Sequence, residues 1–142
     1  KSMQVNVKSV YLTSKLAMPY LRRSKGVIVN ITSTVAIKGV AARAAYSATK
    51  GAVLSLSKSM AAEYVREGIR VNCVCPADVD TPLLRKQLEA SNGGYTLNDM
   101  ADAYPLGRVG RAEEIAHVIC SVASPLNSFM TGSIIPVDGD VK

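Results

Sequence analysis

The sequence predicts an α/β fold, in which helices cover both faces of a parallel β-sheet. Short runs rich in β-branched residues alternate with longer segments of helical periodicity, in the order helix, strand, helix, strand, helix, strand. Strands joined in this way through helices run parallel and have right-handed crossovers. The chain has 142 residues, 48% of them hydrophobic, which is enough for the core of one domain. Three strands make a small sheet, so we expect an incomplete one.

The first helix is expected over residues 3–23, where apolar side chains recur at helical spacing. Arg22 and Arg23 lie at its end, where positive charge interacts favourably with the helix dipole. The run VIVNI, residues 27–31, is rich in β-branched side chains and predicts a buried strand. Small residues dominate the segment after it, which we expect to be a loop.

A long second helix is predicted over residues 44–67, and Gly68 is expected to end it. Its apolar residues recur at four-residue steps, at Ala48, Ala52, Leu56, Met60 and Tyr64. The run IRVNCVCP, residues 69–76, predicts the next strand, which ends at Pro76.

Residues 77–110 are long and mixed in character. We expect one or two short helices there, interrupted at Asn92–Gly94 and at Pro105. A long polar segment of this kind in a compact domain is usually functional or mobile. A third helix is predicted over residues 112–124, with acidic residues in its first turn, and a last strand over residues 132–139.

The charge pattern argues against nucleic-acid binding. The net charge is +6, but the basic residues are dispersed, Trp is absent and there is one Phe. A nucleic-acid site usually needs a concentrated basic stripe with aromatic residues. No run of 18 apolar residues and no apolar block typical of a signal peptide occurs. Together with three cysteines, an odd number, this predicts a cytoplasmic protein with reduced thiols and no membrane partner.

Two cysteines and one histidine are candidates for metal or base chemistry. Cys73 and Cys75 are expected on one face of a strand. A metal site there needs further Cys or His ligands, so buried thiols are the favoured reading and no metal is expected. His117, the single histidine, lies in a helical pattern, which favours a helix-surface or core role over a Ser-His-Asp triad.

Tyr46 and Lys50 are four residues apart on the long helix, so their side chains lie side by side. A tyrosine ordinarily keeps its proton until about pH 10, and a neighbouring ammonium favours the phenolate. Such a pair can exchange a proton with a carbonyl or alcohol oxygen. The alternative is that Tyr46 packs and Lys50 is solvated. Ser33 follows a buried strand at its carboxyl end, where ligands bind in parallel sheets, and this convergence favours a catalytic site.

These segments resemble the short-chain dehydrogenase/reductase family of single-domain Rossmann oxidoreductases, over essentially the whole chain. NITS resembles the family's strand end with its catalytic serine, and YSATK its Y-x-x-x-K motif. GIRVNCVCPADVDTP resembles the strand and turn that hold the nicotinamide end of the cofactor. PLGRVGRAEEIAHVICSVAS and TGSIIPVDGD resemble the closing helix and last strand. The resemblance implies that residues 1–142 form one partial, doubly wound Rossmann-type domain, its C-terminal, catalytic half.

The resemblance also implies catalytic roles for four residues. Tyr46 would be the acid/base, and Lys50 would help it release its proton and bind the nicotinamide ribose. Ser33 would position and polarise the substrate oxygen. Asn6 would support a water and proton path to Lys50, although an asparagine in a helix can also simply kink it or pack.

A nicotinamide cofactor, NAD or NADP, is implied in the same way, with an alcohol or ketone as substrate. The residues expected to contact the cofactor are Tyr46, Lys50, Pro76, Ala77, Val79 and Thr81. Residues 83–104 would form a substrate lid. The apolar side chains of this segment suit either a partly apolar ligand or the packing of the lid itself.

The sequence departs from the family pattern in three respects. Ala77 and Asp140 stand where the family usually has glycine. No G-x-G-x-x-G phosphate loop occurs, so the nucleotide-binding half of the family domain is expected to lie outside the chain. The strand at residues 27–31 is then expected to be an open sheet edge.

Two hypotheses follow from these departures. In the first, the chain is the catalytic half of an oxidoreductase whose nucleotide half is supplied elsewhere. In the second, it is a truncated, catalytically silent module that only associates with other chains. In both, the family resemblance implies a homodimer or homotetramer formed through the helices at residues 3–23 and 44–67.

Overall fold

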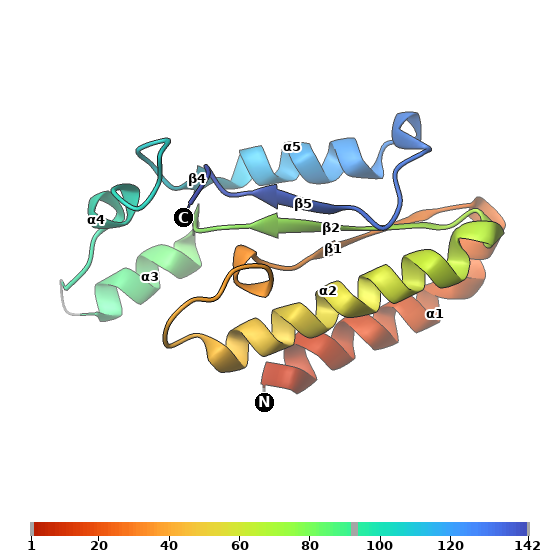
Figure 1. Cartoon of the computed structure of the whole chain (residues 1–142), viewed down its shortest axis with the longest axis horizontal. Helices are drawn as coiled ribbons and strands as arrows, with labels where there is room; N and C mark the ends of the chain where they lie inside the picture. Colours follow the sequence, from red (N-terminus) through yellow and green to blue (C-terminus); the bar gives the residue numbers. More distant parts are fainter. Residues whose placement is uncertain (1, 92–93, 142) are drawn as a thin grey trace.

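The computed structural model of the chain describes residues 2–91 and 94–141. Its central sheet has three parallel strands in the order β1-β2-β5 (Figure 1). The strands are β1 (Val27–Ile31), β2 (Arg70–Pro76) and β5 (Ile134–Val137). In the register, Val27 lies opposite Arg70, and Cys73 lies opposite Ile134. The predicted α/β class with a parallel sheet is therefore confirmed.

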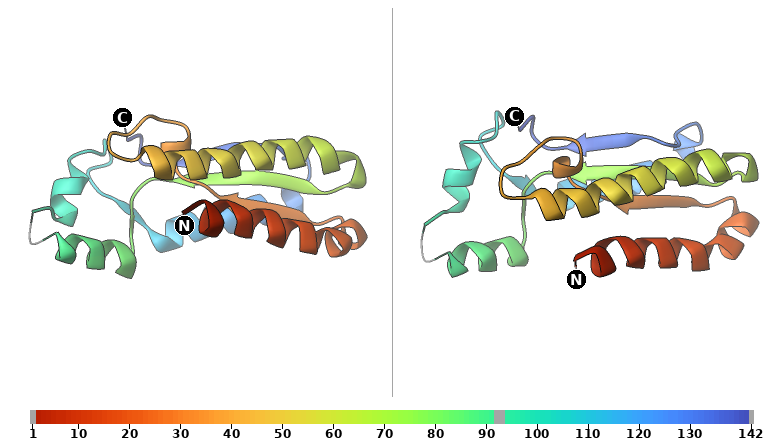
Figure 2. Two further views of the ribbon diagram at one scale, coloured as in Figure 1. Left: turned by 90° about the horizontal axis from the view of Figure 1, so that it is seen from below. Right: turned by 60° about the horizontal axis from the view of Figure 1, so that its bottom comes forward.

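Helices cover both faces of this sheet, as expected. α1 (Ser9–Ser24) and α2 (Ala44–Tyr64) lie side by side on one face, and α5 (Ala112–Ala123) lies on the other (Figures 1 and 2). The helix predicted over residues 3–23 differs at its start, because Gln4–Lys8 form a π-helical turn before α1. Such turns widen a helix locally and are frequent at functional sites.

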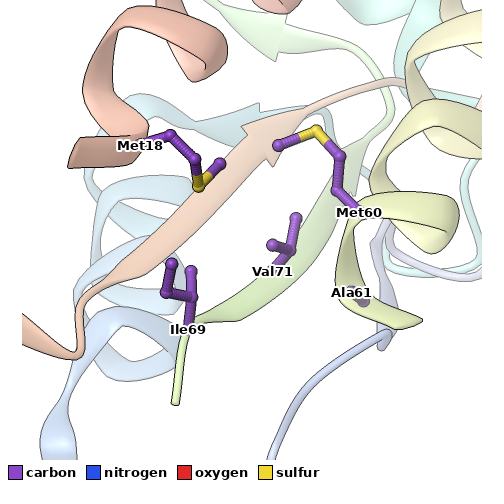
Figure 3. Close-up of a cluster of buried hydrophobic side chains, with 5 residues drawn as sticks. All are labelled: Met18, Met60, Ala61, Ile69 and Val71. Atoms are coloured by element: carbon purple, nitrogen blue, oxygen red, sulfur yellow. The ribbon is translucent and has the colours of Figure 1, made fainter. Parts of the chain in front are cut away.

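Two apolar clusters hold the layers together, one on each face of the sheet. The first joins α1, α2 and β2 through Met18, Met60, Ala61, Ile69 and Val71 (Figure 3). The second joins the sheet to α5 and contains Val74, Ile115 and Val122. Successive side chains of a strand point to opposite faces, so β2 supplies both clusters from alternate positions.

The long helix predicted over residues 44–67 ends slightly earlier in the structure. α2 is followed by a 3₁₀ turn at Val65–Glu67, and Gly68 then takes a left-handed φ of 79°, as expected of a helix stop. The buried positions are Thr49, Val53, Ser57, Met60 and Ala61. Apart from Met60, which was expected, each buried position follows an expected apolar step by one residue, and two of the buried side chains carry hydroxyl groups. The hydroxyl of Ser57 donates to the carbonyl of Val53 at 2.7 Å, which satisfies it without water.

The segment between β2 and α5 lies at the carboxyl end of the sheet (Figure 1). Its elements are β3 (Val79–Asp80), α3 (Pro82–Ala90), α4 (Leu97–Ala101) and β4 (Gly110–Arg111). α4 ends four residues before Pro105, so the expected interruption at Pro105 is wrong. The break expected at Asn92–Gly94 lies partly outside the described residues. β3 and β4 pair in parallel and were not predicted, because two residues carry no periodicity.

Within the described residues, β1 is an edge strand of the central sheet, with no strand on its outer side. There, β1 pairs with β2 alone, as the sequence led us to expect. A groove of about 310 Å³ lies along this edge between α1 and β1. None of the helices within residues 2–91 and 94–141 combines the length and the apolar character needed to cross a bilayer.

Candidate active site

Tyr46 and Lys50 lie on the first turns of α2, close to the carboxyl end of β1. The ammonium nitrogen of Lys50 is 5.8 Å from the centroid of the Tyr46 ring. The same nitrogen donates a hydrogen bond to the carbonyl of Ile31 at 3.2 Å, which ties α2 to the last residue of β1. Burial lowers the pKa of Lys50, because its charged form is less well solvated there. The two side chains are therefore adjacent, as the helical spacing predicted.

Ser33 is held at the end of β1, two residues after Ile31. Its side chain accepts a hydrogen bond from the backbone nitrogen of Val35 at 3.4 Å and so caps a 3₁₀ turn at Thr34–Ala36 that contacts α2. The preceding Thr32 is buried, and its backbone nitrogen donates to the carbonyl of Val74 at 2.9 Å. This bond extends the pairing of β1 and β2 to the edge of the site and fixes the position of the serine.

Asn6 is linked to the same helix turn through a residue that the sequence reading missed. The Asn6 side-chain nitrogen donates to the hydroxyl of Thr49 at 3.1 Å, and this hydroxyl donates to the carbonyl of Tyr46 at 2.8 Å. Thr49 is 1% exposed. Asn6 thus contacts the helix turn that carries Tyr46 through the side chain of Thr49. In the sequence, the signal for Thr49 is its place three residues after Tyr46.

Pro76 ends the central strand, and Ala77 follows it, at the carboxyl end of the sheet where Ser33 also lies. The nitrogen of Ala77 donates to the carbonyl of Val137 at 3.2 Å, on the β5 side. The nitrogen of Pro76 therefore faces the β1 side, where β1 has already ended, and the proline costs no ladder bond. Ala77 does not adopt a positive φ, so this backbone does not need the conformational freedom of glycine.

Val79 and Thr81 follow on the chain and connect the sheet to α3. Val79 pairs with Gly110 in the short β3–β4 ladder. The Thr81 hydroxyl accepts a hydrogen bond from the nitrogen of Leu84 at 3.2 Å and caps α3. Asp140, the other departure from the family glycines, takes a left-handed φ of 60°, which aspartate tolerates better than most residues.

Hydrogen bonds thus connect Lys50 to Ile31, two residues before Ser33, and connect Asn6 through Thr49 to the backbone of Tyr46. Of the other residues expected to bind the cofactor, Pro76 ends β2, the strand next to β1, and Ala77, Val79 and Thr81 follow it along the chain. The start of α2 offers a phenol and an ammonium, and the segments that follow β1 and β2 offer the hydroxyl groups of Ser33 and Thr81. These groups are suited to hydrogen bonds with oxygen atoms and to proton transfer.

The cysteines and the histidine are not among these candidate residues, although the Cys75 sulfur lies 2.7 Å from the hydroxyl of Thr32, beside Ser33. Cys73 and Cys75 are buried, which confirms the favoured reading, and burial raises the pKa of both thiols. Cys120 and His117 are exposed on α5. Across residues 2–91 and 94–141, no three His, Cys, Asp or Glu side chains are grouped so that they could share a metal ion.

Comparison with known proteins identifies relatives along nearly the whole chain. The matching family model, described as enoyl-(acyl carrier protein) reductase, covers residues 1–141. The zebrafish (Danio rerio) protein named dehydrogenase/reductase SDR family member 6 is 42% identical over 141 residues, which are 97% of this chain and 58% of that relative.

Two solved structures share the fold. The aldohexose dehydrogenase of Thermoplasma acidophilum superposes with a TM-score of 0.90 and 37% identity, over 98% of this chain and 57% of that one. ElxO with NADP bound has a TM-score of 0.87 and 30% identity, over 94% of this chain and 54% of that one. The chain therefore spans a little over half the length of the proteins that it resembles.

Proposed function

The chain belongs to the short-chain dehydrogenase/reductase family, and from this premise we propose that the protein carrying it is an NAD(P)-dependent oxidoreductase. The proposed reaction transfers a hydride between a nicotinamide and an alcohol/carbonyl pair. In this proposal residues 1–142 are the part of a Rossmann-type domain that holds the reacting groups.

One observation carries the proposal. The Lys50 ammonium lies 5.8 Å from the Tyr46 ring and donates to Ile31, two residues before Ser33, so a single side chain connects the helix turn with the strand end. In this proposal the Tyr46 phenol and the Lys50 ammonium, both on α2, and the Ser33 hydroxyl at the end of β1 serve one oxygen-binding position. This arrangement suits a carbonyl that is reduced or an alcohol that is oxidised.

The donors at this edge fit the nicotinamide end of NAD or NADP. The ribose and carboxamide of this end need hydroxyl, ammonium and backbone partners, and Lys50, Thr81 and the backbone around Ala77 and Val79 offer them. When bound, the cofactor supplies or accepts the hydride. The bound NADP of ElxO supports this choice of cofactor for the present chain.

The chain's own residues manage the proton and the substrate oxygen. Tyr46 gives the proton to the oxygen or takes it, and the Lys50 ammonium lies beside its ring, 5.8 Å from the ring centroid. Ser33 holds the same oxygen by a hydrogen bond. Asn6 keeps the first turn of α2 in place through Thr49, and with it the position of Tyr46.

The segment over residues 83–104 is proposed as the substrate lid. α3 and α4 lie beyond the carboxyl end of the sheet, next to the proposed site (Figure 1). Leu83 and Tyr95 are exposed, and they suit contact with a partly apolar alcohol or ketone.

A second candidate function is association without catalysis. Exposed apolar side chains recur on one face of the first helix, at Val5, Leu12, Leu16 and Tyr20. Such a stripe favours contact with another chain, and a homodimer or homotetramer through the helices at 3–23 and 44–67 would cover it. Catalysis and association are compatible, and measured turnover separates the second candidate from the first.

The test is turnover of the Tyr46→Phe variant, which keeps the ring and removes the proton carrier. We expect the rate of NADH or NADPH oxidation with a short keto acid or a 3-oxoacyl thioester to fall at least about a hundredfold. Ser33→Ala should also lower turnover while cofactor affinity is largely kept. Tyr11→Phe, which alters an exposed tyrosine of α1, is the matched control and should keep the wild-type rate.

Near-normal turnover in Tyr46→Phe would sink the assignment of the acid/base. A Ser33→Ala variant that loses cofactor binding instead of turnover would show that the serine has a different role. No turnover and no nicotinamide binding in the wild-type protein would favour the association module.

A further inference from the structure

Tyr104 is a buried tyrosine outside the proposed catalytic set. It is 6% exposed, although both of its chain neighbours are exposed. Its hydroxyl oxygen lies 3.0 Å from the backbone nitrogen of Asp78 and 2.7 Å from a carboxylate oxygen of the same residue. The hydroxyl therefore accepts a hydrogen bond from the Asp78 backbone nitrogen and donates one to the Asp78 carboxylate. Burial, and then the bond to Asp78, raises the pKa of Tyr104, so the hydroxyl keeps its proton in neutral solution.

This contact joins the two ends of the proposed lid. Asp78 and Tyr104 are 26 residues apart, and α3 and α4 lie between them. On one side, Asp78 directly follows Ala77 at the end of β2. On the other side, Tyr104 follows α4 and precedes the residues that lead into β4. The hydrogen bonds therefore close the base of a long excursion at the point where it leaves the sheet.

The turn that Tyr104 grips is also the turn expected to hold the nicotinamide. Its other bonds run from the Ala77 nitrogen to Val137 and from the Gly110 nitrogen to the Asp78 carbonyl, at 3.2 and 3.0 Å. Gly139 lies close to the Tyr104 ring: a Cβ added at Gly139 would be 3.4 Å from a ring carbon. Three separate segments thus meet at this turn and hold its backbone.

A small cavity of about 110 Å³ lies beside the turn, but its charged side chains already have hydrogen-bond or ion-pair partners. Arg108 pairs with Glu114, and Asp138 pairs with Lys38. These pairs argue against a separate ligand site and leave the hydroxyl of Tyr104 with a mechanical role.

We propose that Asp78 and Tyr104 form a latch that positions the Ala77–Thr81 turn for the nicotinamide and closes the base of the lid. The inference rests on the proposed function for what the turn binds. Neither residue touches the reacting atoms in this proposal, so both are positioning residues. Hydrogen bonds hold the turn where the family more often has glycine, at Ala77.

The test is hydrogen exchange of the ligand-free protein together with cofactor titration. Tyr104→Phe keeps the ring and removes the acceptor of the Asp78 amide. We expect this amide to exchange at least about tenfold faster. We also expect the KM for NADH or NADPH to rise about three- to tenfold, with kcat much less affected at saturating cofactor.

Two further variants sharpen the test. Asp78→Asn keeps a side-chain oxygen that accepts from the Tyr104 hydroxyl, so the amide at position 78 should exchange more slowly in this variant than in Tyr104→Phe. Tyr11→Phe removes an exposed hydroxyl and should leave the exchange of the Asp78 amide unchanged.

Wild-type exchange of the Asp78 amide in Tyr104→Phe would overturn the latch, whatever the activity. Faster exchange with an unchanged KM for cofactor would overturn the positioning role. If the wild-type protein binds no nicotinamide, the proposed function fails, and the exchange rates still decide whether the latch exists.

Discussion

Lys50 brings a charge into a partly buried position beside Tyr46. Its ammonium has the carbonyl of Ile31 as a partner at 3.2 Å, which offsets part of the cost of leaving water. Burial nevertheless lowers the pKa of Lys50, so the folded protein binds this proton less tightly than the unfolded chain does. A partly buried charge of this kind lowers the stability of the fold.

We predict a pH-dependent effect of the Lys50→Met substitution on stability. Between the lowered folded pKa of Lys50 and its ordinary value of 10.5, the unfolded chain binds more protons at this residue. The free energy of unfolding of the wild type should therefore rise with pH relative to Lys50→Met. Urea unfolding of both proteins at about pH 7 and about pH 10 measures this difference. A difference that stays constant or changes in the opposite direction would contradict the burial of the charge.

At the scale of elements, the start of α5 connects the end of the lid segment to the sheet. Glu114 accepts a hydrogen bond from the backbone nitrogen of Arg111 at 2.8 Å and two from the Arg108 guanidinium, at 2.8 and 2.7 Å. A carboxylate in the first turn also interacts favourably with the helix dipole. The Arg108 guanidinium and then the Arg111 amide lower the pKa of Glu114 to about 2.

Glu114→Gln should therefore lower the melting temperature at neutral pH. The folded pKa is depressed, so the stabilisation is present above the ordinary value of 4.5 and is lost as the pH falls toward about 2. Melting curves of both proteins from neutral to acid pH should converge over this range. Glu113→Gln, one residue earlier on the same exposed turn, is the matched control and should have a smaller effect at neutral pH. Equal effects of the two substitutions would show that the cap contributes little.

At the scale of the whole molecule, α1 has more apolar surface than the chain itself covers. Met18 is buried against the first cluster, but Leu16 is 73% exposed and Tyr20 66% exposed. Both were among the apolar residues that predicted an amphipathic helix. The structure turns Met18 and the small Ser14 toward the sheet instead, which leaves a larger apolar stripe outside.

We predict that Leu16→Lys weakens self-association. A lysine in the middle of the stripe would have to lose its hydration in a helix–helix contact, so the dimer should dissociate at least about tenfold more readily. Size-exclusion chromatography with light scattering over a range of concentrations measures the mass. Leu126→Lys changes another exposed leucine, away from α1 and α2, and should keep the proposed dimer. A monomer from Leu126→Lys and none from Leu16→Lys would move the contact to the other side of the molecule.

The sequence predicts the elements of the fold more completely than it predicts the contacts of the site. Strands and helices were predictable because β-branched runs and helical spacing are local properties, and Gly68 marks its helix stop by its own conformational freedom. The adjacency of Tyr46 and Lys50 follows from the helix period alone. Thr49 was missed because its link to Asn6 crosses 43 residues.

The sequence by itself determined the class of fold, the order of its elements and the pairing of Tyr46 with Lys50, since each depends on residues within a few positions of one another. Only the tertiary structure decided which face of α2 is buried, that Lys50 bonds to Ile31, and that Tyr104 grips Asp78. These features join residues 19 and 26 positions apart, or depend on how a helix is rotated against the sheet. Such contacts depend on strand register and side-chain packing, and these depend on many interactions between residues that are distant in the sequence.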